Sequence, residues 1–295
     1  MPSDNDARFG RIGIWSSALH PSDPRGLSAV SAAVAELDAL GYGTIWMGGS
    51  PSLDQVAPVV RATRHITVAT GILSIWEHTA QAVAERTARI QKDAGGRFVL
   101  GLGVSHGGFN PNYARPYSAM VEYLDALDAA ADPVPASGRV LAALGPKMLK
   151  LSAGRAAGAH PYLVTAEHTA QARATLGPHA LLAPELTVVL DTDIDRARTV
   201  ARGMLSMYLQ LPNYTDNLLR LGFAEGDFAD GGSNRLLAAL FALGDPGTVR
   251  ARVDEYLAAG ADHVAIQVLS GDRGEDLPLA QWRTLAEALE LPPRV

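Results

Sequence analysis

The sequence contains no cysteine, which excludes disulfide bonds, thiolate metal ligands and cysteine nucleophiles. Basic residues are outnumbered, because 25 Lys and Arg stand against 31 Asp and Glu and give a formal net charge of -6 at pH 7. Since no block of Lys and Arg stands out either, we expect neither nucleic acid nor an anionic membrane surface as a partner. No apolar run approaches the ~18 residues that a membrane span requires.

The amino terminus lacks the basic and then apolar segments of a secretion signal, so we expect a cytoplasmic protein. The eight histidines are scattered, and none has the His-Glu-x-x-His spacing of a zinc site, so no metal site is predicted. A Gly-x-Ser-x-Gly nucleophile elbow is absent as well. A small-molecule substrate is therefore the expected partner.

Apolar residues make up 47% of the 295 residues, enough to bury a large core. Short apolar or β-branched runs alternate with windows whose apolar residues recur at helical spacing. The predicted strands cover residues 11–15, 44–47, 66–74, 98–102, 139–144, 160–165, 186–190 and 263–269. This alternation predicts a single-domain (β/α)8 TIM barrel over residues 1–295, with a doubly wound sheet as the alternative. We expect a loose tail at 1–9 and a helical insertion at 212–243, before the eighth strand.

One stretch organises the chain, namely the buried strand at 98–102 and the glycine-rich turn that follows it. Gly101 and Gly103 let neighbouring backbone come close, and Ser105 and His106 follow at the carboxyl end of the strand. In parallel α/β folds, ligands bind at that end. We therefore place a flat redox cofactor there, with His106 nearest to the reacting atom.

Several short motifs appear in the order typical of a known family. They are Gly10–Trp15, Ile45–Ser50, Ala69–Leu73, Phe98–Gly103 and Ala143–Met148, followed by Leu243–Val249 and Gly260–Val264. With these motifs, nearly the whole chain resembles luciferase-like monooxygenases, and most of all the actinobacterial branch that uses the deazaflavin coenzyme F420. The resemblance implies a TIM barrel with the cofactor ring across its carboxyl-terminal mouth, and a homodimer. FMN is the alternative cofactor.

The resemblance also assigns residues to the cofactor ring and tail. Gly71-Ile72 matches a non-prolyl cis peptide that supports the ring, with a glycine for tight strand packing as the alternative. Ser74 would then hydrogen-bond the ring or its side chain. Val104 and Ser105 would offer backbone groups to the cofactor tail.

The cofactor phosphate is expected at Gly145-Pro146, where a strand runs directly into a helix. Free N–H groups at that helix start, together with the helix dipole, bind anions. Lys147 adds charge there or is only a solvated residue of the first turn. Val164 and Thr165 match a further phosphate-side position of the family.

Three histidines receive different interpretations. His106 lies where related deazaflavin enzymes carry a Glu that acts as acid or base. Because histidine titrates near neutrality, His106 is a candidate for proton transfer, for simple contact with cofactor or substrate, or for a solvent-facing loop position. His160 is expected to be structural, and His168 to cap a helix or lie on the surface in preference to binding phosphate.

Gly48-Gly49-Ser50 replaces the Asp-His pair that the sugar-phosphate dehydrogenase branch carries after its second strand, which argues against that reaction and makes room for a bulky ring. The sequence thus predicts an F420-dependent oxidoreductase that transfers a hydride between the cofactor and a small organic substrate. A reduced-FMN-dependent monooxygenase and a non-catalytic cofactor-binding protein are the alternatives. A phosphosugar lyase or isomerase would need Lys or paired carboxylates at the strand ends, where this chain has Gly, Ser, His and Thr.

Overall fold

Short apolar runs form parallel strands throughout this computed structural model, which describes residues 4–20, 24–107, 113–270 and 277–294. The strands are β1 (Ile12–Ser16), β2 (Thr44–Met47), β3 (Thr67–Thr70), β4 (Leu73–Ser74), β5 (Phe98–Gly103), β6 (Arg139–Leu141), β7 (Gly158–Ala159), β8 (Leu181–Leu182), β9 (Glu185–Leu190), β10 (Phe241–Gly244) and β11 (Val264–Val268). Almost all of their residues are buried, as expected for a sheet that is covered on both faces.

The sheet closes on itself. Its strand order is β10-β9-β11-β1-β2-β3-β5-β6-β7-β8, and β8 runs into β9 after only Ala183 and Pro184. The amides of Asp262 and Ala265 donate to the carbonyls of Leu182 and Pro184, each at 2.9 Å, so this continuous segment also pairs with the β11 side. With β3 and β4 counted as one strand, and β8 and β9 as another, eight parallel strands form the barrel and β10 pairs with β9 beside it. The predicted (β/α)8 fold is confirmed.

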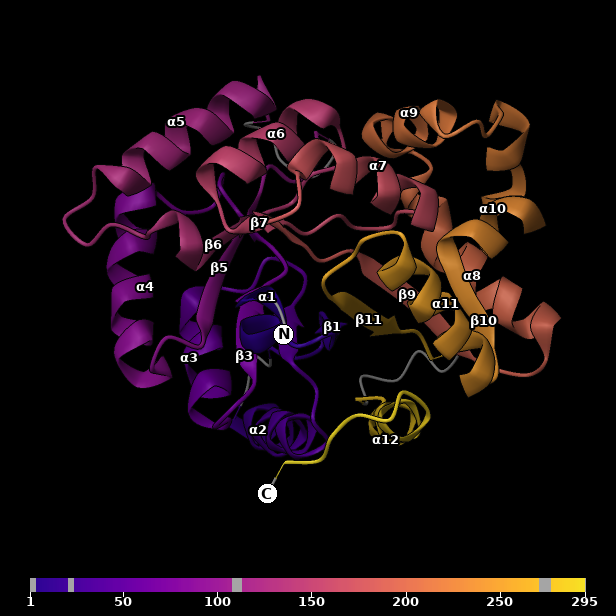
Figure 1. Ribbon diagram of the computed structural model, residues 1–295, viewed down its shortest axis with the longest axis horizontal. Coiled ribbons are helices and arrows are strands. Elements are labelled where there is room, and N and C mark those ends of the chain that lie inside the picture. Colours follow the sequence, from indigo (N-terminus) through magenta and orange to yellow (C-terminus); the bar gives the residue numbers. More distant parts are fainter. Residues whose placement is uncertain (1–3, 21–23, 108–112, 271–276, 295) are drawn as a thin grey trace.

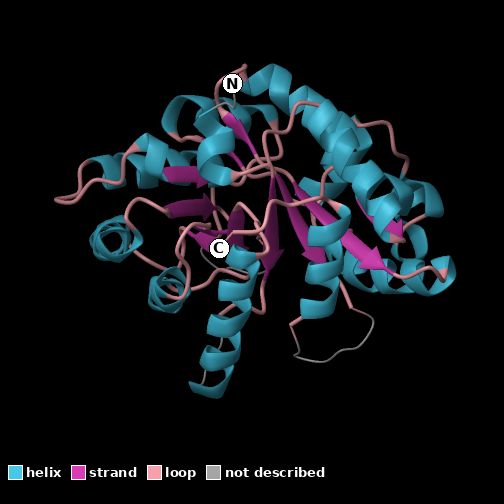
Figure 2. Cartoon of the chain, turned by 60° about the horizontal axis from the view of Figure 1, so that its bottom comes forward, coloured by secondary structure: helices cyan, strands magenta, loops and turns pink. Residues whose placement is uncertain are grey.

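Helices surround the strands on the outside (Figure 2). They are α1 (Asp4–Phe9), α2 (Pro24–Ala39), α3 (Leu53–Arg61), α4 (Ala80–Ala94), α5 (Pro116–Asp128), α6 (Pro146–Arg155), α7 (Ala166–Leu176), α8 (Ile194–Tyr208), α9 (Pro212–Arg220), α10 (Asn234–Leu240), α11 (Pro246–Ala258) and α12 (Leu279–Ala288), with 3-10 turns at Ala136–Gly138 and Glu225–Gly231. In Figure 1 the insertion, with α9 and α10 in orange, lies to one side of the ring beside α7 and α8. None of the helices in the described ranges is long and apolar enough to cross a membrane.

The amino-terminal segment differs from the expected loose tail, because residues 4–9 form α1. Phe9 is 1% exposed and stacks on Trp46 with ring centroids 6.3 Å apart. The backbone carbonyls of Arg8 and Phe9 accept hydrogen bonds from the Thr67 and Thr44 hydroxyls, each at 2.7 Å. A single aromatic side chain packs this segment against the core. Because apolar residues do not recur along it at helical spacing, the sequence does not predict its helix.

One predicted strand and the predicted helical insertion need correction. The sixth strand is not at 160–165 but at Gly158–Ala159, and Leu163 adopts a left-handed φ of 53° that ends any extended run. A Cβ on Gly158 would lie 2.0 Å from the Leu181 carbonyl oxygen, so only glycine permits this pairing. The insertion also contains β10, because Phe241–Gly244 extends from the end of α10 as a strand that pairs with β9.

The contact between β3 and β5 contains a bulge. Ala69 pairs with Val99 and Leu73 with Leu102, so four steps along one strand match three along the other. Inside the bulge, the Thr70 hydroxyl donates to the Gly101 carbonyl at 2.7 Å and accepts from the Gly101 amide at 2.8 Å. A Cβ on Gly101 would lie 1.8 Å from the Thr70 carbonyl oxygen. One hydroxyl thus replaces the ladder hydrogen bonds that the extra residue displaces.

We predict that Thr70→Val destabilises the protein by about 1–3 kcal/mol, because it leaves the buried amide and carbonyl of Gly101 without partners. Thr70→Ser keeps the hydroxyl and should lose less than half as much. Urea unfolding of the two variants and the parent protein measures both free energies. A loss in Thr70→Ser that exceeds the loss in Thr70→Val, which keeps a methyl group but has no hydroxyl, would contradict the assignment to the hydroxyl.

Candidate active site

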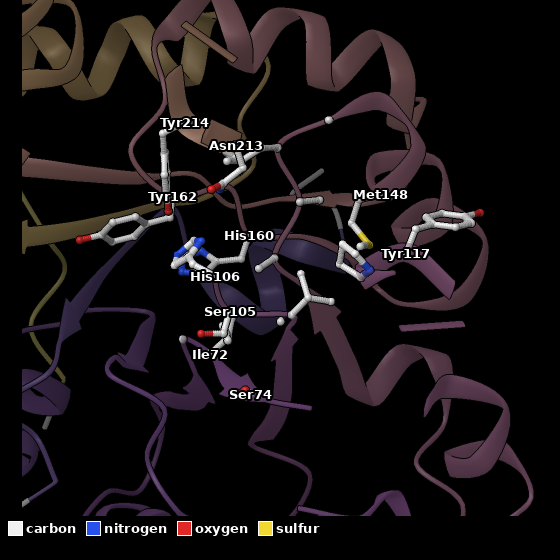
Figure 3. A pocket seen from close by; sticks show the side chains of 18 of the residues that line it. Ile72, Ser74, Ser105, His106, Tyr117, Met148, His160, Tyr162, Asn213 and Tyr214 are labelled. Atoms are coloured by element: carbon white, nitrogen blue, oxygen red, sulfur yellow. The ribbon is translucent and has the colours of Figure 1, made fainter. Parts of the chain in front are cut away.

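A cavity of about 740 Å³ opens at the carboxyl-terminal mouth of the barrel, and Figure 3 shows side chains that line it. Its walls come from residues at or just beyond the ends of β1 to β7, and from α8 and α9. Its size lies within the usual range for small-molecule and cofactor sites. Nine predicted site residues line it: Gly71, Ile72, Ser74, Val104, Ser105, His106, Gly145, Pro146 and Lys147.

The Gly71-Ile72 peptide bond is cis, which confirms the prediction for this position. Behind it, the indole Nε1 of Trp15 donates to the Gly71 carbonyl oxygen at 2.8 Å. A Cβ on Gly48 would lie 2.2 Å from the Trp15 ring, so the glycine makes room for this indole. The space beside Gly48 is therefore filled by a tryptophan of the chain itself, and room after β2 for a cofactor ring or a bulky substrate stays a prediction.

Ser74 and Ser50 connect the same wall to the loop after β2. The Ser50 hydroxyl accepts a hydrogen bond from the Ser74 amide at 3.0 Å and donates to Glu77 at 2.9 Å. Both serines line the cavity. The Ser74 backbone is thereby fixed beside the cavity, and a hydrogen bond from its hydroxyl to a cofactor stays a prediction.

His106 packs against α9 and does not face open solvent, so the solvent-facing alternative is wrong. Its ring centroid lies 5.4 Å from that of Tyr214, and its ring interacts with the Asn213 side chain. Burial lowers the pKa of His106, and the hydrogen bond with Asn213 only partly offsets this effect. His106 is therefore a neutral imidazole at pH 7.

The start of α6 lies at one end of the cavity. Gly145 caps the helix without a side chain, and its carbonyl accepts the first helical hydrogen bond from the Leu149 amide at 3.0 Å. The amides of Lys147 and Met148 lie in the first turn, where no helical partner is available. Lys147 is exposed, and Arg220 of α9 lines the same cavity. Two cationic side chains and the helix dipole therefore favour a phosphate here.

Val164 and Thr165 are not among the cavity-lining residues. The Thr165 side chain accepts a hydrogen bond from the His168 amide at 3.1 Å and caps α7, while the Val164 carbonyl accepts from the Tyr256 hydroxyl. His168 is 3% exposed, so its surface interpretation is wrong, and its Nε2 pairs with the Leu144 carbonyl at 2.9 Å. These groups position the loop before α6.

A polar layer lies where the barrel interior meets the cavity. The Tyr162 hydroxyl donates to Gln267 Oε1 at 2.8 Å, and the Tyr208 hydroxyl donates to that of Tyr162 at 3.3 Å. The carboxylate of Glu185 accepts from the Leu163 amide at 3.1 Å, which holds the left-handed turn after Tyr162. Burial raises the pKa of Glu185 to about 7.

Sequence reasoning missed several residues of this site. Asn213, Tyr214 and Arg220 come from the insertion, and Tyr162 comes from the segment that was predicted as the sixth strand. His160, which was expected to be structural, also lines the cavity. No motif marks these residues, because their positions depend on how α9 folds over the mouth and on the turn that follows β7.

A closed parallel barrel with a deep cavity at its carboxyl-terminal mouth defines a TIM-barrel enzyme. Residues 10–263 match the family model described as luciferase-like monooxygenase, and the chain belongs to that family of oxidoreductases and monooxygenases. The resemblance found in the sequence is thus confirmed.

Three proteins are similar to this chain, one in part of its sequence and two in fold. A 4-hydroxyprotoasukamycin monooxygenase from Streptomyces nodosus subsp. asukaensis is 37% identical over 106 residues, or 31% of this chain and only 28% of that protein. The structure of an F420-dependent secondary alcohol dehydrogenase with an F420-acetone adduct covers 95% of this chain and 98% of its own at 12% identity, with a TM-score of 0.71. The oxygenating constituent of 3,6-diketocamphane monooxygenase from Pseudomonas putida, in complex with FMN, covers 95% and 97% at 12% identity, with a TM-score of 0.66. The two structures show a shared fold.

We predict that Glu185→Gln gains stability relative to the parent protein as the pH rises from 5 to 8. The pKa of Glu185 is raised from 4.5 to about 7, so the folded state binds more protons than the unfolded state between these values, and the parent loses stability as pH rises through this window. At 1.36 kcal/mol per pKa unit, the relative gain is about 3 kcal/mol. Unfolding free energies of both proteins at pH 5 and pH 8 test this. A difference that does not change with pH would contradict it.

Proposed function

We propose that the protein is an F420-dependent oxidoreductase that transfers a hydride between the deazaflavin and a small organic substrate. One observation carries the proposal: a single cavity joins the apolar wall at Ile72 to the uncapped start of α6 at Gly145. A flat ring with a phosphate-bearing tail needs both of these features. The choice of F420 rests on the motifs of the sequence.

The residues present fit such a cofactor. Ile72 and Val104 provide apolar surface for a ring, with Trp15 fixed behind the Gly71-Ile72 bond. The first-turn amides of α6, with Lys147 and Arg220, provide the positive end. The cofactor, when bound, supplies the hydride chemistry.

The chain itself orients the reactants and controls protons. His106, held between Asn213 and Tyr214, presents a neutral imidazole that hydrogen-bonds the substrate or exchanges a proton with it. Because these two residues belong to α9, the same helix that orients His106 also covers the mouth and excludes water. The resemblance further implies a homodimer, which light scattering of the purified protein tests.

A reduced-FMN-dependent monooxygenase is the second candidate, supported by the 37% identical monooxygenase segment and the fold shared with an FMN complex. FMN and F420 both combine a flat ring with a phosphate, so the start of α6 suits either. A cofactor-binding protein without turnover is the remaining alternative. Tight F420 binding with no change in F420 oxidation state across a panel of alcohols and ketones would favour it.

We predict that purified protein binds oxidised F420 more tightly than FMN, and that Gly145→Asp weakens F420 binding at least about tenfold. The aspartate repels the phosphate and competes for the same amides. No atom lies within 4 Å of a Cβ at Gly145, and its φ of -88° and ψ of 159° suit any capping residue, so the fold should persist. Titrations that follow cofactor fluorescence measure these affinities.

Two matched variants separate the effect of the aspartate's charge from the effects of its size and of its hydrogen bonds to the amides. Gly145→Ala adds only a Cβ and should bind F420 like the parent protein, whereas Gly145→Asn occupies the amides without a charge and should give an intermediate loss. A preference for FMN would move the assignment to a flavin monooxygenase. Binding of neither cofactor would refute the cofactor site.

A further inference from the structure

His160 follows β7 directly, and its ring is held in one orientation. The ring is 2% exposed and stacks on the Trp46 indole with centroids 4.1 Å apart and planes 8° apart. Its Nδ1 lies 2.6 Å from the Ala183 carbonyl oxygen. A carbonyl oxygen only accepts hydrogen bonds, so Nδ1 carries the hydrogen.

This assignment leaves Nε2 of His160 as an acceptor. Burial lowers the pKa of His160 to about 4, so the ring is neutral at pH 7 and only one of its nitrogens is protonated. Within the described ranges, Nε2 has no hydrogen-bond partner. His160 nevertheless lines the cavity beside Tyr162 (Figure 3).

His263 provides an internal comparison. It is equally buried, and its Nδ1 also pairs with a backbone carbonyl, that of Gly10 at 2.8 Å. Its Nε2, however, accepts a hydrogen bond from the Trp46 indole at 3.0 Å. Both rings contact Trp46, and the one whose Nε2 lacks a partner is the one that lines the cavity. An unsatisfied buried acceptor is costly, so it points to a partner supplied from outside the chain.

We propose that His160 Nε2 accepts a hydrogen bond from an O–H or N–H group of the ligand that fills the cavity. The donor is either a ring N–H of the bound cofactor or a hydroxyl of the substrate. The first source rests on the proposed function, whereas the second needs only that the cavity takes a small organic molecule. In both cases His160 selects ligands that carry a donor over analogues of the same shape that lack one.

The test is ¹⁵N NMR of histidine-labelled full-length protein, with the His160 signals identified by their loss in His160→Asn. We expect the free protein to show the Nδ1–H tautomer at pH 7. Oxidised F420, FMN, cyclohexanol and cyclohexanone are then added in separate titrations, and the alcohol and ketone are also added together with each cofactor. Cyclohexanol donates a hydrogen bond, and cyclohexanone, of nearly the same shape, does not.

An upfield shift of Nε2 on adding a cofactor alone identifies the cofactor as the donor. A shift that appears with cyclohexanol and not with cyclohexanone identifies a substrate hydroxyl. A protonated Nε2 in the free protein, or no shift in any titration, overturns the proposal. Cofactor fluorescence in the same samples reports separately on the proposed function, because a failure of both cofactors to bind leaves the cyclohexanol titration decisive for His160.

Binding by variants gives a second readout. His160→Asn keeps an amide donor for the Ala183 carbonyl but leaves no acceptor at the position of Nε2, and should weaken binding of the ligand that shifts Nε2 at least about tenfold. His263→Asn is the matched control, because it removes an equally buried ring that does not line the cavity. It should lower the unfolding midpoint as much while changing ligand affinity less than threefold. Equal losses of affinity in both variants would mean that packing alone is responsible.

Discussion

The mouth of this barrel depends on one close contact, between Thr70 of β3 and Gly101 of β5. The Thr70 hydroxyl makes both hydrogen bonds to the Gly101 backbone, which allows one extra residue between β3 and β4, on the Thr70 side of the contact. Because side chains alternate along a strand, one extra residue reverses which side chains face the cavity beyond it. Ile72 thereby lies against β5, where a Cβ on Gly103 would come within 2.5 Å of its side chain. The glycines of β5 and the hydroxyl of Thr70 together place the wall on which a flat ring can rest.

The same burial that stabilises the barrel sets the protonation states at its mouth. Desolvation lowers the pKa of His160 and of His263 to about 4 and raises that of Glu185 to about 7. The two histidines are thus neutral at pH 7, and Glu185 is partly protonated there. Neutral groups interact through directed hydrogen bonds instead of long-range charge, so their tautomers decide what they recognise. Among the described residues that line the cavity, formal positive charge is found at Lys147 and Arg220.

The sequence predicted those features that local patterns encode. Strand and helix periodicity predicted the barrel, and a glycine before a helix that starts with proline predicted the uncapped start of α6. Features that depend on contacts between distant segments were missed. The placement of β7 depends on how closely Gly158 approaches Leu181, and the cover over His106 depends on the fold of α9. His160 was predicted to be structural, and it is buried and stacked on Trp46, but only the position of the Ala183 carbonyl shows which ring nitrogen is left over.

The two ends of the cavity differ in how much they can discriminate. The end at Gly145 consists of backbone amides and two exposed cations, and such a site binds any phosphate-bearing tail that reaches it. The inner end is built from side chains whose hydrogen bonds are already fixed, as the bonds of Tyr162 to Gln267 and of His160 to Ala183 show. A fixed acceptor rejects a ligand group that has no hydrogen to donate, whereas a flexible or solvated acceptor would tolerate the same group. Under the proposed function, discrimination between cofactors with similar tails, and between an alcohol and a ketone as substrate, comes from this inner end.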